Sequence, residues 1–389
     1  MTTKTSTVKT SVRLLAALAI ALPTILVIIG IRSSIDVSSG LSKQKGRLEY
    51  YVSAATGASL VLLRSGNDAW GFFEWPEKRF YGFFSGKAQR GRRDEIKAAI
   101  RSASEQPLAI VIPARNVLGK MTIHLEGGKK TEGSFSFEES KLHDFNIESF
   151  AGRIDAGGRA VSPFRSLLKP ISIEDGGADF ANSFFHIYAL GGKATAVSEL
   201  FDNKLRRGTH ILDYARDHWE RFGEDRRAAA VTGTGNPSRV FVERQFLIPS
   251  LPDLYSIATE RYVYSGGAHG NTTMVFETVD VVDGKTLGPS DIFVDGWEKP
   301  MAGKIRAEAL SAFSDLPGEA PTTLLSHGFF DEAIHPSSSL FLCKTGIGFH
   351  YDRYELAPYS AGDFTFIVPW NELGGLLKIP AMREMAEGK

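Results

Sequence analysis

The first 47 residues contain a long apolar segment followed by a polar one. Residues 14–31 (LLAALAIALPTILVIIGI) carry no charged side chain, whereas residues 32–47 (RSSIDVSSGLSKQKGR) are rich in serine, glycine and basic residues. As a helix the apolar segment rises about 27 Å, close to the ~30 Å hydrocarbon core of a bilayer. The pattern predicts a transmembrane signal anchor at 14–31, after a cytoplasmic N-terminus at 1–13 and before a solvated linker at 32–47.

The charges that flank the apolar segment predict its orientation. Lys4, Lys9 and Arg13 precede it, and no acidic residue accompanies them. Basic residues favour the cytoplasmic side, so we expect a single-pass protein of the cytoplasmic membrane with the bulk of the chain periplasmic or extracellular. A cleaved signal peptide is the alternative, although the run exceeds the usual ~7–15-residue apolar region and no A-x-A site follows. Either reading exports the rest of the chain.

Short aromatic and β-branched runs fill residues 48–150, separated by Gly, Asn, Asp and Pro. Such runs predict a small β-rich domain, with hairpins around 76–78 and 127–128. One stretch, 92–104, places its apolar residues on one helical face, so we expect a helix there.

Residues 165–380 mix helical and strand periodicities, after a candidate linker at 151–165. The fold class we expect is α+β: a C-terminal antiparallel sheet with packed helices, preceded by the small β-rich domain. Helical spacing predicts helices at 205–222 and 300–313. Strands are expected at 239–248, 255–265, 273–282, 339–351 and 363–370.

Composition narrows the function classes. Acidic and basic residues balance at 45 each, and no basic run with interleaved aromatics favours nucleic acid. The single cysteine, Cys343, allows no intramolecular disulfide and lies in an apolar run typical of a buried strand. No G-x-S-x-G, H-E-x-x-H or C-x-x-C motif occurs, so we expect no metal, no cofactor and no assigned catalytic residue.

A glycine-rich stretch, YSGGAHGN at 264–271, allows three interpretations. Its glycines favour a turn between strands, where the histidine would hydrogen-bond a neighbouring group and fix the loop. A binding loop that presents its side chains to a partner is the second, and acid–base or metal chemistry is the third. The candidate residues are Tyr264, Gly266, Gly267, His269 and Asn271.

A second stretch, FHYDRYELAPYSAGDFTFIVPWNEL at 349–373, suggests a rigid, tyrosine-rich turn. Pro358 pre-sets the turn, and Tyr359 follows it. Tyr354 and Glu355 come just before, and exposed tyrosines on a rigid loop make good partner anchors. We therefore include these four residues among the candidate binding residues.

Together these two stretches carry a resemblance. The first, extended to YVYSGGAHGNTTMVFETVDVVDGKTLGPSDIF, and the second resemble the core and the closing segment of a domain family of exported bacterial proteins, over about residues 165–380. That family is shared with the lysozyme-binding extracytoplasmic part of the anti-sigma-V factor and with a polysaccharide-deacetylase-associated domain of unknown function. The resemblance implies an α+β domain at the cell envelope, used mainly for binding. Sigma regulation and deacetylation are not carried over, because the segment before the anchor is short and no paired His–Asp metal motif is present.

The sequence therefore favours a membrane-anchored envelope protein with a non-catalytic extracytoplasmic binding or sensing domain. Its expected partner is an extracytoplasmic protein, with lysozyme as a candidate, or cell-wall glycan. The alternative is an envelope hydrolase acting on peptidoglycan or another glycan through His269 with Glu355 or Asp352. A structural envelope protein without a soluble ligand is the third reading.

Overall fold

The computed structural model describes part of the chain, in segments between Leu41 and Gly388. Residues Lys43–Lys389 form one compact unit. No helix among the described residues is long and apolar enough to cross a membrane. The expected anchor at 14–31 lies outside them and stays a prediction. The described ranges are 41–52, 57–66, 68–76, 80–89, 92–103, 119–126, 132–138, 151–154, 168–175, 180–189, 213–218, 220–221, 224, 239–251, 254–264, 270–280, 283–314 and 323–388.

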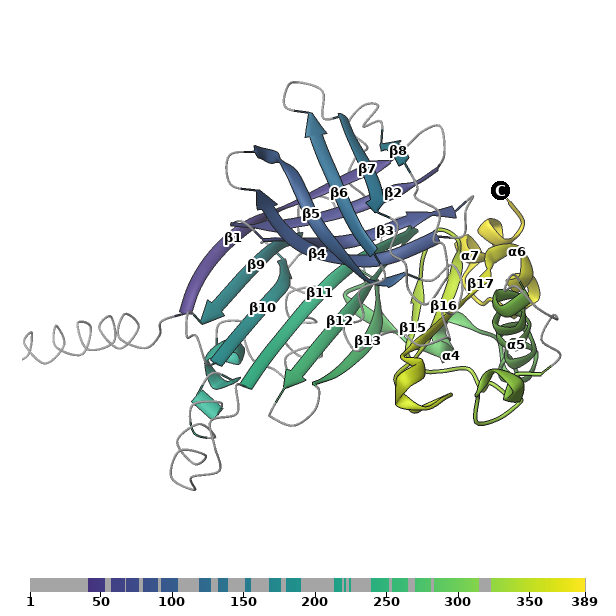
Figure 1. The fold of residues 1–389 in the computed structure, drawn as a ribbon. Coiled ribbons are helices and arrows are strands. Elements are labelled where there is room, and N and C mark those ends of the chain that lie inside the picture. Colours follow the sequence, from purple (N-terminus) through teal and green to yellow (C-terminus); the bar gives the residue numbers. More distant parts are fainter. Residues whose placement is uncertain are drawn as a thin grey trace, which may run out of the picture. The chain divides into compact units, whose positions relative to one another are not determined.

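The described strands form two sheets (Figure 1). The larger has fourteen strands in the order β14-β13-β12-β11-β10-β9-β1-β2-β3-β4-β5-β6-β7-β8, and the smaller has the order β15-β16-β17. The pairings recorded for these strands are antiparallel, except that β10 and β11 run parallel. The strands are β1 (Leu41–Val52), β2 (Ser59–Ser65), β3 (Asp68–Trp75), β4 (Phe80–Gln89), β5 (Arg92–Ala103), β6 (Gly119–Glu126), β7 (Glu132–Glu138), β8 (Ala151–Ile154), β9 (Leu168–Asp175), β10 (Phe180–Ala189), β11 (Arg239–Leu251), β12 (Leu254–Tyr264), β13 (Asn271–Asp280), β14 (Lys285–Leu287), β15 (Leu340–Leu342), β16 (Gly346–Tyr351) and β17 (Phe364–Pro369).

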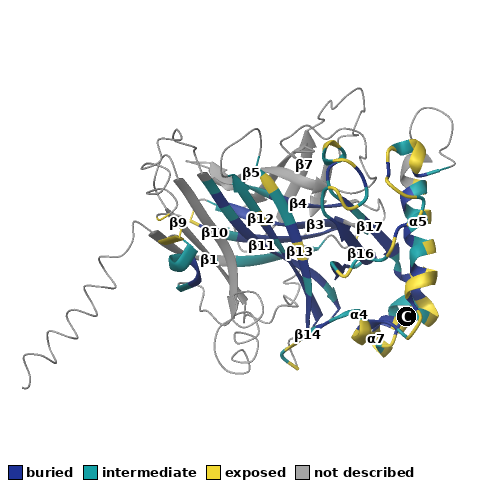
Figure 2. Ribbon diagram, turned by 90° about the horizontal axis from the view of Figure 1, so that it is seen from below, coloured by how far each residue is buried: buried dark blue, intermediate teal, exposed yellow. Residues whose placement is uncertain are grey.

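Helices gather beside the smaller sheet (Figure 1). The longest, α5 (Glu298–Ser314), buries Met301, Ile305 and Ala309 at helical spacing and exposes its opposite face (Figure 2). This confirms the helix predicted at 300–313. Residues 213–218, within the helix predicted at 205–222, are helical as well. The remaining helices are α4 (Pro289–Ile292), η3 (Leu325–His327), η4 (Tyr359–Ala361), α6 (Trp370–Leu373), η5 (Gly374–Leu376) and α7 (Pro380–Ala386).

The smaller sheet lies between two hydrophobic cores because its side chains alternate between its faces. Leu342, Phe349 and Val368 join the core that includes the buried residues of α5. Phe341 and Ile367 point the other way, into a second core shared with the larger sheet. The C-terminal strands therefore connect the helices with the larger sheet.

In that second core, strands β2–β4 pack against β11–β13. The rings of Phe83 and Phe246 lie 4.9 Å apart, and the Trp70 Nε1–H donates to the Gln245 carbonyl at 2.9 Å. A fully buried carboxylate adds a polar link: Glu74 on β3 accepts hydrogen bonds from the backbone N–H groups of Lys344 and Thr345, at 3.2 and 2.7 Å, and from the Thr345 hydroxyl at 2.6 Å. The β15–β16 turn is thus fastened to the N-terminal strands.

Comparison with the sequence expectations gives a mixed result. The α+β class is confirmed, as are four of the five strands predicted in the C-terminal part and the two hairpins, β3–β4 and β6–β7. The single strand predicted at 339–351 is wrong: residues 343–345 divide it into β15 and β16, which pair antiparallel as a hairpin. The helix predicted at 92–104 is wrong: these residues form β5, which pairs with β4 and β6. Ile96, Ala98 and Ile100 also fit a period of two, and pairing with two neighbouring strands decided between the periodicities. Residues 41–47 and 151–154, expected in linkers, belong to β1 and β8. The division into domains at 48–150 and 165–380 stays a prediction.

Candidate functional site

The two stretches singled out in the sequence meet in space. The hydroxyl of Tyr359, the first residue of η4, donates a hydrogen bond to the carbonyl oxygen of Gly270 at 3.0 Å. Gly270 directly precedes β13. The Tyr262 ring packs so closely on it that a Cβ at this position would overlap the ring. A bond between residues 89 positions apart therefore joins the glycine-rich stretch to the turn at 352–362, called the tyrosine turn below.

Aromatic and basic side chains stack on the tyrosine turn. The guanidinium of Arg353 donates to the Tyr359 hydroxyl at 2.8 Å, and its Cζ lies 4.7 Å from the centroid of that ring. The rings of Tyr354 and Tyr359 are 5.6 Å apart and tilted by 41°. Tyr354 is 64% exposed and has a φ of 70°, a left-handed conformation that is uncommon for a bulky residue. The turn thus holds a large aromatic side chain in water, in a backbone geometry that its neighbours must maintain.

A buried histidine supports the start of this turn. Nδ1 of His350 lies 2.9 Å from the Thr365 hydroxyl, and its Nε2 lies 3.3 Å from Oδ1 of Asp352. The same carboxylate oxygen accepts the Met274 N–H at 3.1 Å, which ties the turn to β13. The Asp352 N–H in turn donates to Oε2 of Glu355 at 2.8 Å. The carboxylates of Asp352 and Glu355 therefore both cap backbone groups of the turn or of the adjoining strand.

The structure places six of the nine predicted binding residues. Tyr264 ends β12 and is half-buried, while Asn271 begins β13 and is exposed. Tyr354, Glu355, Pro358 and Tyr359 all lie on the tyrosine turn. Gly266, Gly267 and His269 lie outside the described residues, so the pairing of His269 with Glu355 or Asp352 in a hydrolase stays a prediction.

Beside the tyrosine turn is a cleft of about 540 Å³, called the lateral cleft below. Glu355 and Leu356 line it, so the cleft and the turn share two residues. No lysine or arginine is among the described residues that form its lining. Its walls carry three aromatic rings, three ionisable groups and two serines: Phe329, Phe330, Tyr351, Asp331, His335, Glu355, Ser337 and Ser338.

Hydrogen bonds hold the walls of the lateral cleft together. The Phe330 N–H donates to the Leu356 carbonyl at 2.8 Å, joining the loop at 328–338 to the tyrosine turn. The Tyr351 hydroxyl donates to the His335 carbonyl at 2.8 Å. Burial raises the pKa of Tyr351, so this donor stays protonated at neutral pH. The cleft is therefore formed before any ligand arrives.

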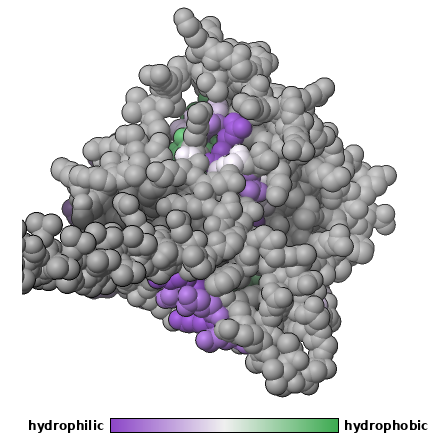
Figure 3. Space-filling view, turned by 90° about the vertical axis from the view of Figure 1, so that its left-hand side faces the viewer, coloured by the Kyte–Doolittle hydropathy of each residue, from purple (hydrophilic) through white to green (hydrophobic). Residues whose placement is uncertain are grey.

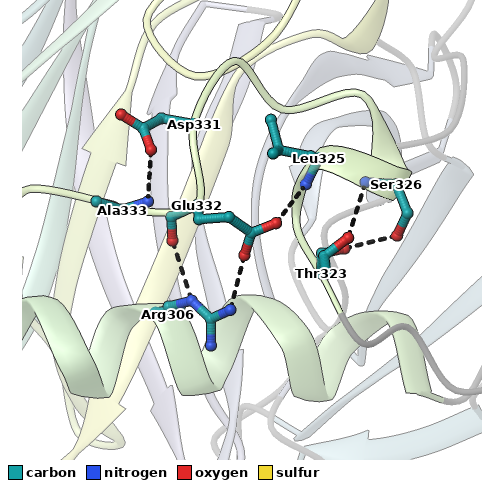
Figure 4. Close-up of polar contacts among 7 residues, drawn as sticks. All are labelled: Arg306, Thr323, Leu325, Ser326, Asp331, Glu332 and Ala333. Atoms are coloured by element: carbon teal, nitrogen blue, oxygen red, sulfur yellow. Dashed lines mark hydrogen bonds and ion pairs between the residues drawn. The ribbon is translucent and has the colours of Figure 1, made fainter.

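An arginine on α5 fastens the loop that carries the outer wall (Figure 4). Arg306 donates through Nε to the Glu332 carbonyl at 3.0 Å and through a terminal nitrogen to the Glu332 carboxylate at 2.7 Å. The other oxygen of that carboxylate accepts the Leu325 N–H at 3.0 Å. The Leu325 N–H and the Arg306 guanidinium lower the pKa of Glu332. This pair of Arg306 and Glu332, called the clamp below, thus ties to α5 the loop that carries Phe330 and Asp331.

Other parts of the described chain offer less to a ligand. No group of three or more His, Cys, Asp or Glu side chains within the described ranges could hold a metal ion. On the face seen in Figure 3, the described residues that reach the surface are mainly hydrophilic. Among the residues that the structure describes, four large hydrophobic side chains are strongly exposed: Val275, Leu325, Phe330 and Tyr354. Phe330 lines the lateral cleft, and Tyr354 lies on the tyrosine turn that borders it.

Sequence reasoning missed the lateral cleft and its clamp. The loop at 328–338 (GFFDEAIHPSS) shows no helical or strand periodicity. The signal in the sequence was the pair Phe329 and Phe330, which lies outside every predicted helix and strand; the structure buries the first ring and exposes the second.

Comparison with known proteins places part of this region in a family. Residues 290–371 match the model of a family described as a protein of unknown function, DUF3298, so the chain carries a DUF3298 domain there. The match covers the smaller sheet, α5, the lateral cleft and the tyrosine turn. A search of curated proteins gave no match.

Two solved structures of DUF3298 proteins are similar to this chain. One, from Bacteroides fragilis, is 17% identical and gives a TM-score of 0.49, with 57% of this chain and 98% of that chain covered. The other, from Pseudomonas aeruginosa, is also 17% identical, with a TM-score of 0.42, and covers 55% of this chain and 95% of that chain.

Proposed function

We propose that this protein is a bacterial envelope protein, anchored in the cytoplasmic membrane by residues 14–31, whose extracytoplasmic part binds a protein partner without catalysing a reaction. The apolar N-terminal segment and its basic flank support the location. The resemblance of the two sequence stretches to the lysozyme-binding family supports the binding role.

The observation that carries the proposal is the junction of these two stretches at the Tyr359–Gly270 hydrogen bond. The bond holds Tyr359 next to the residue that precedes the exposed Asn271, and the exposed ring of Tyr354 lies 5.6 Å from that of Tyr359. Exposed tyrosines on a preorganised support supply large contact area at little cost in conformational entropy. A surface of this kind suits recognition of a folded partner.

Charge favours a basic partner. The lateral cleft beside this surface is lined by the exposed carboxylates of Asp331 and Glu355. No lysine or arginine is among its described lining residues. Complementary charge speeds association and excludes wrong partners. A c-type lysozyme, a small basic protein that acts on the cell wall from outside the cell, is therefore the first partner to test.

The test is a calorimetric titration of the full chain, in a mild non-ionic detergent, with c-type lysozyme. A second basic protein of similar size, such as cytochrome c, serves as the control for charge alone. We expect saturable binding at micromolar or tighter affinity for lysozyme and none for the control. Tyr354→Asn removes the exposed ring and keeps a residue that tolerates positive φ; it should weaken binding by about tenfold or more. If the folded wild type does not bind lysozyme, lysozyme is not the partner. Hydrolysis of a glycan fragment by the protein would favour the hydrolase alternative instead.

Location has its own test. Full-length protein expressed in a bacterium should sediment with membranes, and protease added to spheroplasts should digest the bulk of the chain. Recovery in the soluble cytoplasmic fraction would contradict the anchor.

A further inference from the structure

We propose that the lateral cleft is a receptor site for a single cationic side chain, an arginine or lysine presented by the protein partner. This rests on the proposed function for the nature of the partner, and on the cleft itself for the chemistry.

Size and shape fit an inserted side chain. At about 540 Å³ the cleft falls within the ~300–1,000 Å³ range typical of ligand pockets. The bonds from Phe330 to Leu356 and from Tyr351 to His335 fix its two sides, so entry of a ligand needs no rearrangement of the walls. Preformed walls lower the entropic cost of binding.

The lining matches the two parts of a long basic side chain. Aromatic rings, among them the exposed Phe330, offer apolar surface for the methylene stem and ring faces for the charged head. Lysine and arginine commonly bury their stems in this manner while the head group reaches polar atoms.

Two carboxylates supply the counter-charge. Oδ1 of Asp331 accepts the Ala333 N–H at 3.1 Å, and Oε2 of Glu355 accepts the Asp352 N–H at 2.8 Å. These bonds orient both side chains, and within the described residues each carboxylate keeps its second oxygen for a ligand. Both side chains belong to exposed residues, so a cation reaches them without first crossing a dry core. A guanidinium suits this arrangement best, because its planar fork donates to carboxylates and stacks on aromatic rings.

The clamp explains why the site holds its shape. The guanidinium of Arg306 on α5 donates to the carbonyl and to the carboxylate of Glu332, which follows Asp331 in the loop (Figure 4). The loop therefore uses one carboxylate for its own attachment and leaves the neighbouring one directed to the cleft lining.

The experiment uses the full chain in non-ionic detergent and two peptides, acetyl-Gly-Arg-Gly-amide and its counterpart with citrulline, which has the shape of arginine without its charge. Saturation-transfer NMR measures binding of each peptide. We expect saturable binding of the arginine peptide and binding at least about tenfold weaker for citrulline, which corresponds to about 1.4 kcal/mol. Equal binding of the two peptides, or none, would overturn the proposal.

Variants locate the site. Phe330→Ala and Glu355→Gln should each weaken the arginine peptide by about tenfold. Glutamine retains the acceptor for the Asp352 N–H, so the second change removes charge without removing the cap. Leu325→Ala is the matched control, since Leu325 and Phe330 are both 55% exposed and only Phe330 lines the cleft; it should bind as the wild type does. If Phe330→Ala and Glu355→Gln bind the arginine peptide as tightly as the wild type does, the peptide does not bind in the lateral cleft and the proposal is wrong. Displacement of the peptide by a neutral chitin trimer would also contradict a cation site.

The same variants separate this proposal from the proposed function. If lysozyme binds and responds to Tyr354→Asn while the arginine peptide does not bind, the cleft proposal fails and the binding role stands. If the peptide binds through Phe330 and Glu355 while lysozyme does not bind, the cleft is a cation site and lysozyme is the wrong partner.

Discussion

The hydroxyl of Tyr359 donates to the carbonyl of Gly270 across 3.0 Å, and this bond connects the tyrosine turn with the start of β13. Arg353 reinforces it from the other side by donating to the same hydroxyl. The tyrosine thus acts as both donor and acceptor, a role that phenylalanine cannot fill. A position expected to anchor a partner is also a fastening point of the fold.

Tyr359→Phe should therefore cost stability. The variant keeps the ring under Arg353 but removes the hydroxyl that donates to Gly270 and accepts from Arg353, so we expect the free energy of unfolding to fall by at least about 0.5–1.5 kcal/mol. Urea denaturation followed by tryptophan fluorescence measures the change. Tyr354→Phe is the matched control, because it removes the hydroxyl of a 64% exposed ring, and it should unfold with the wild type. Equal stability of the two variants would mean that the two hydrogen bonds of the Tyr359 hydroxyl contribute nothing to folding.

The clamp between Arg306 and Glu332 gives a second prediction. Glu332→Gln removes the charge that holds the guanidinium, so the loop at 328–338 should open more often. Hydrogen exchange should then accelerate several-fold at the amide of Leu325, which donates to the Glu332 carboxylate. Because the pKa of Glu332 is lowered, its contribution is present above the ordinary carboxyl pKa and is lost as the pH falls through the lowered value.

The matched control for this clamp is Glu384→Gln, an exposed carboxylate on α7. It should leave exchange at Leu325 unchanged. Unaltered exchange in Glu332→Gln would show that the loop is held by the Phe330–Leu356 bond and the core alone.

Periodicity predicted the C-terminal elements well for a physical reason. In β15 and β17 apolar side chains on both faces are buried: Leu342 and Val368 lie in the core that includes α5, and Phe341 and Ile367 lie in the core shared with the larger sheet. Strands buried on both faces read as apolar runs, which is why the sequence predicted them. Helix α5 touches the core on one side only, which preserves the helical spacing of Ile305 and Ala309 in the sequence.

Sequence periodicity gave the wrong secondary structure where pairing with neighbouring strands decides it. Residues 92–104 fit a helical face and a strand equally, and the pairing with β4 and β6 made them β5. The candidate site could be predicted only in part. The glycine and tyrosine motifs identified both stretches in the sequence, but the bond between Tyr359 and Gly270 depends on the fold. The lateral cleft depends on Arg306 reaching a loop 26 residues away, and no local pattern encodes such a contact.

Close packing between β16 and β15 gives a third prediction. A Cβ added at Gly348 would overlap the ring of Phe341, which is fully buried in the second core. Gly348→Ala should therefore lower the free energy of unfolding by about 1–3 kcal/mol, the usual cost of overpacking. Gly375→Ala is the control, since nothing lies within 4 Å of its added Cβ, and it should be neutral or slightly stabilising. A neutral Gly348→Ala would indicate that Phe341 can move aside.

The last prediction concerns Glu74, the buried carboxylate that fastens the β15–β16 turn. Burial raises its pKa above the ordinary 4.5, and its hydrogen bonds with Thr345 and Lys344 offset only part of that effect. The folded state therefore binds this proton more tightly than the unfolded state does. The contribution of Glu74 is fully present below about pH 4.5 and declines as the pH rises through the raised pKa.

Measurement of this effect requires urea unfolding of the wild type and Glu74→Gln from pH 4 to pH 8, because glutamine does not titrate. The stability of the wild type relative to the variant should decline with rising pH, by no more than about 1.4 kcal/mol per pH unit, since a single proton is released. Thr345→Val deletes a hydrogen bond that favours the charged form, so its decline should extend to higher pH. A difference that stays constant above pH 4.5 would mean that Glu74 is already ionised in the folded protein, and that its three donors outweigh its burial.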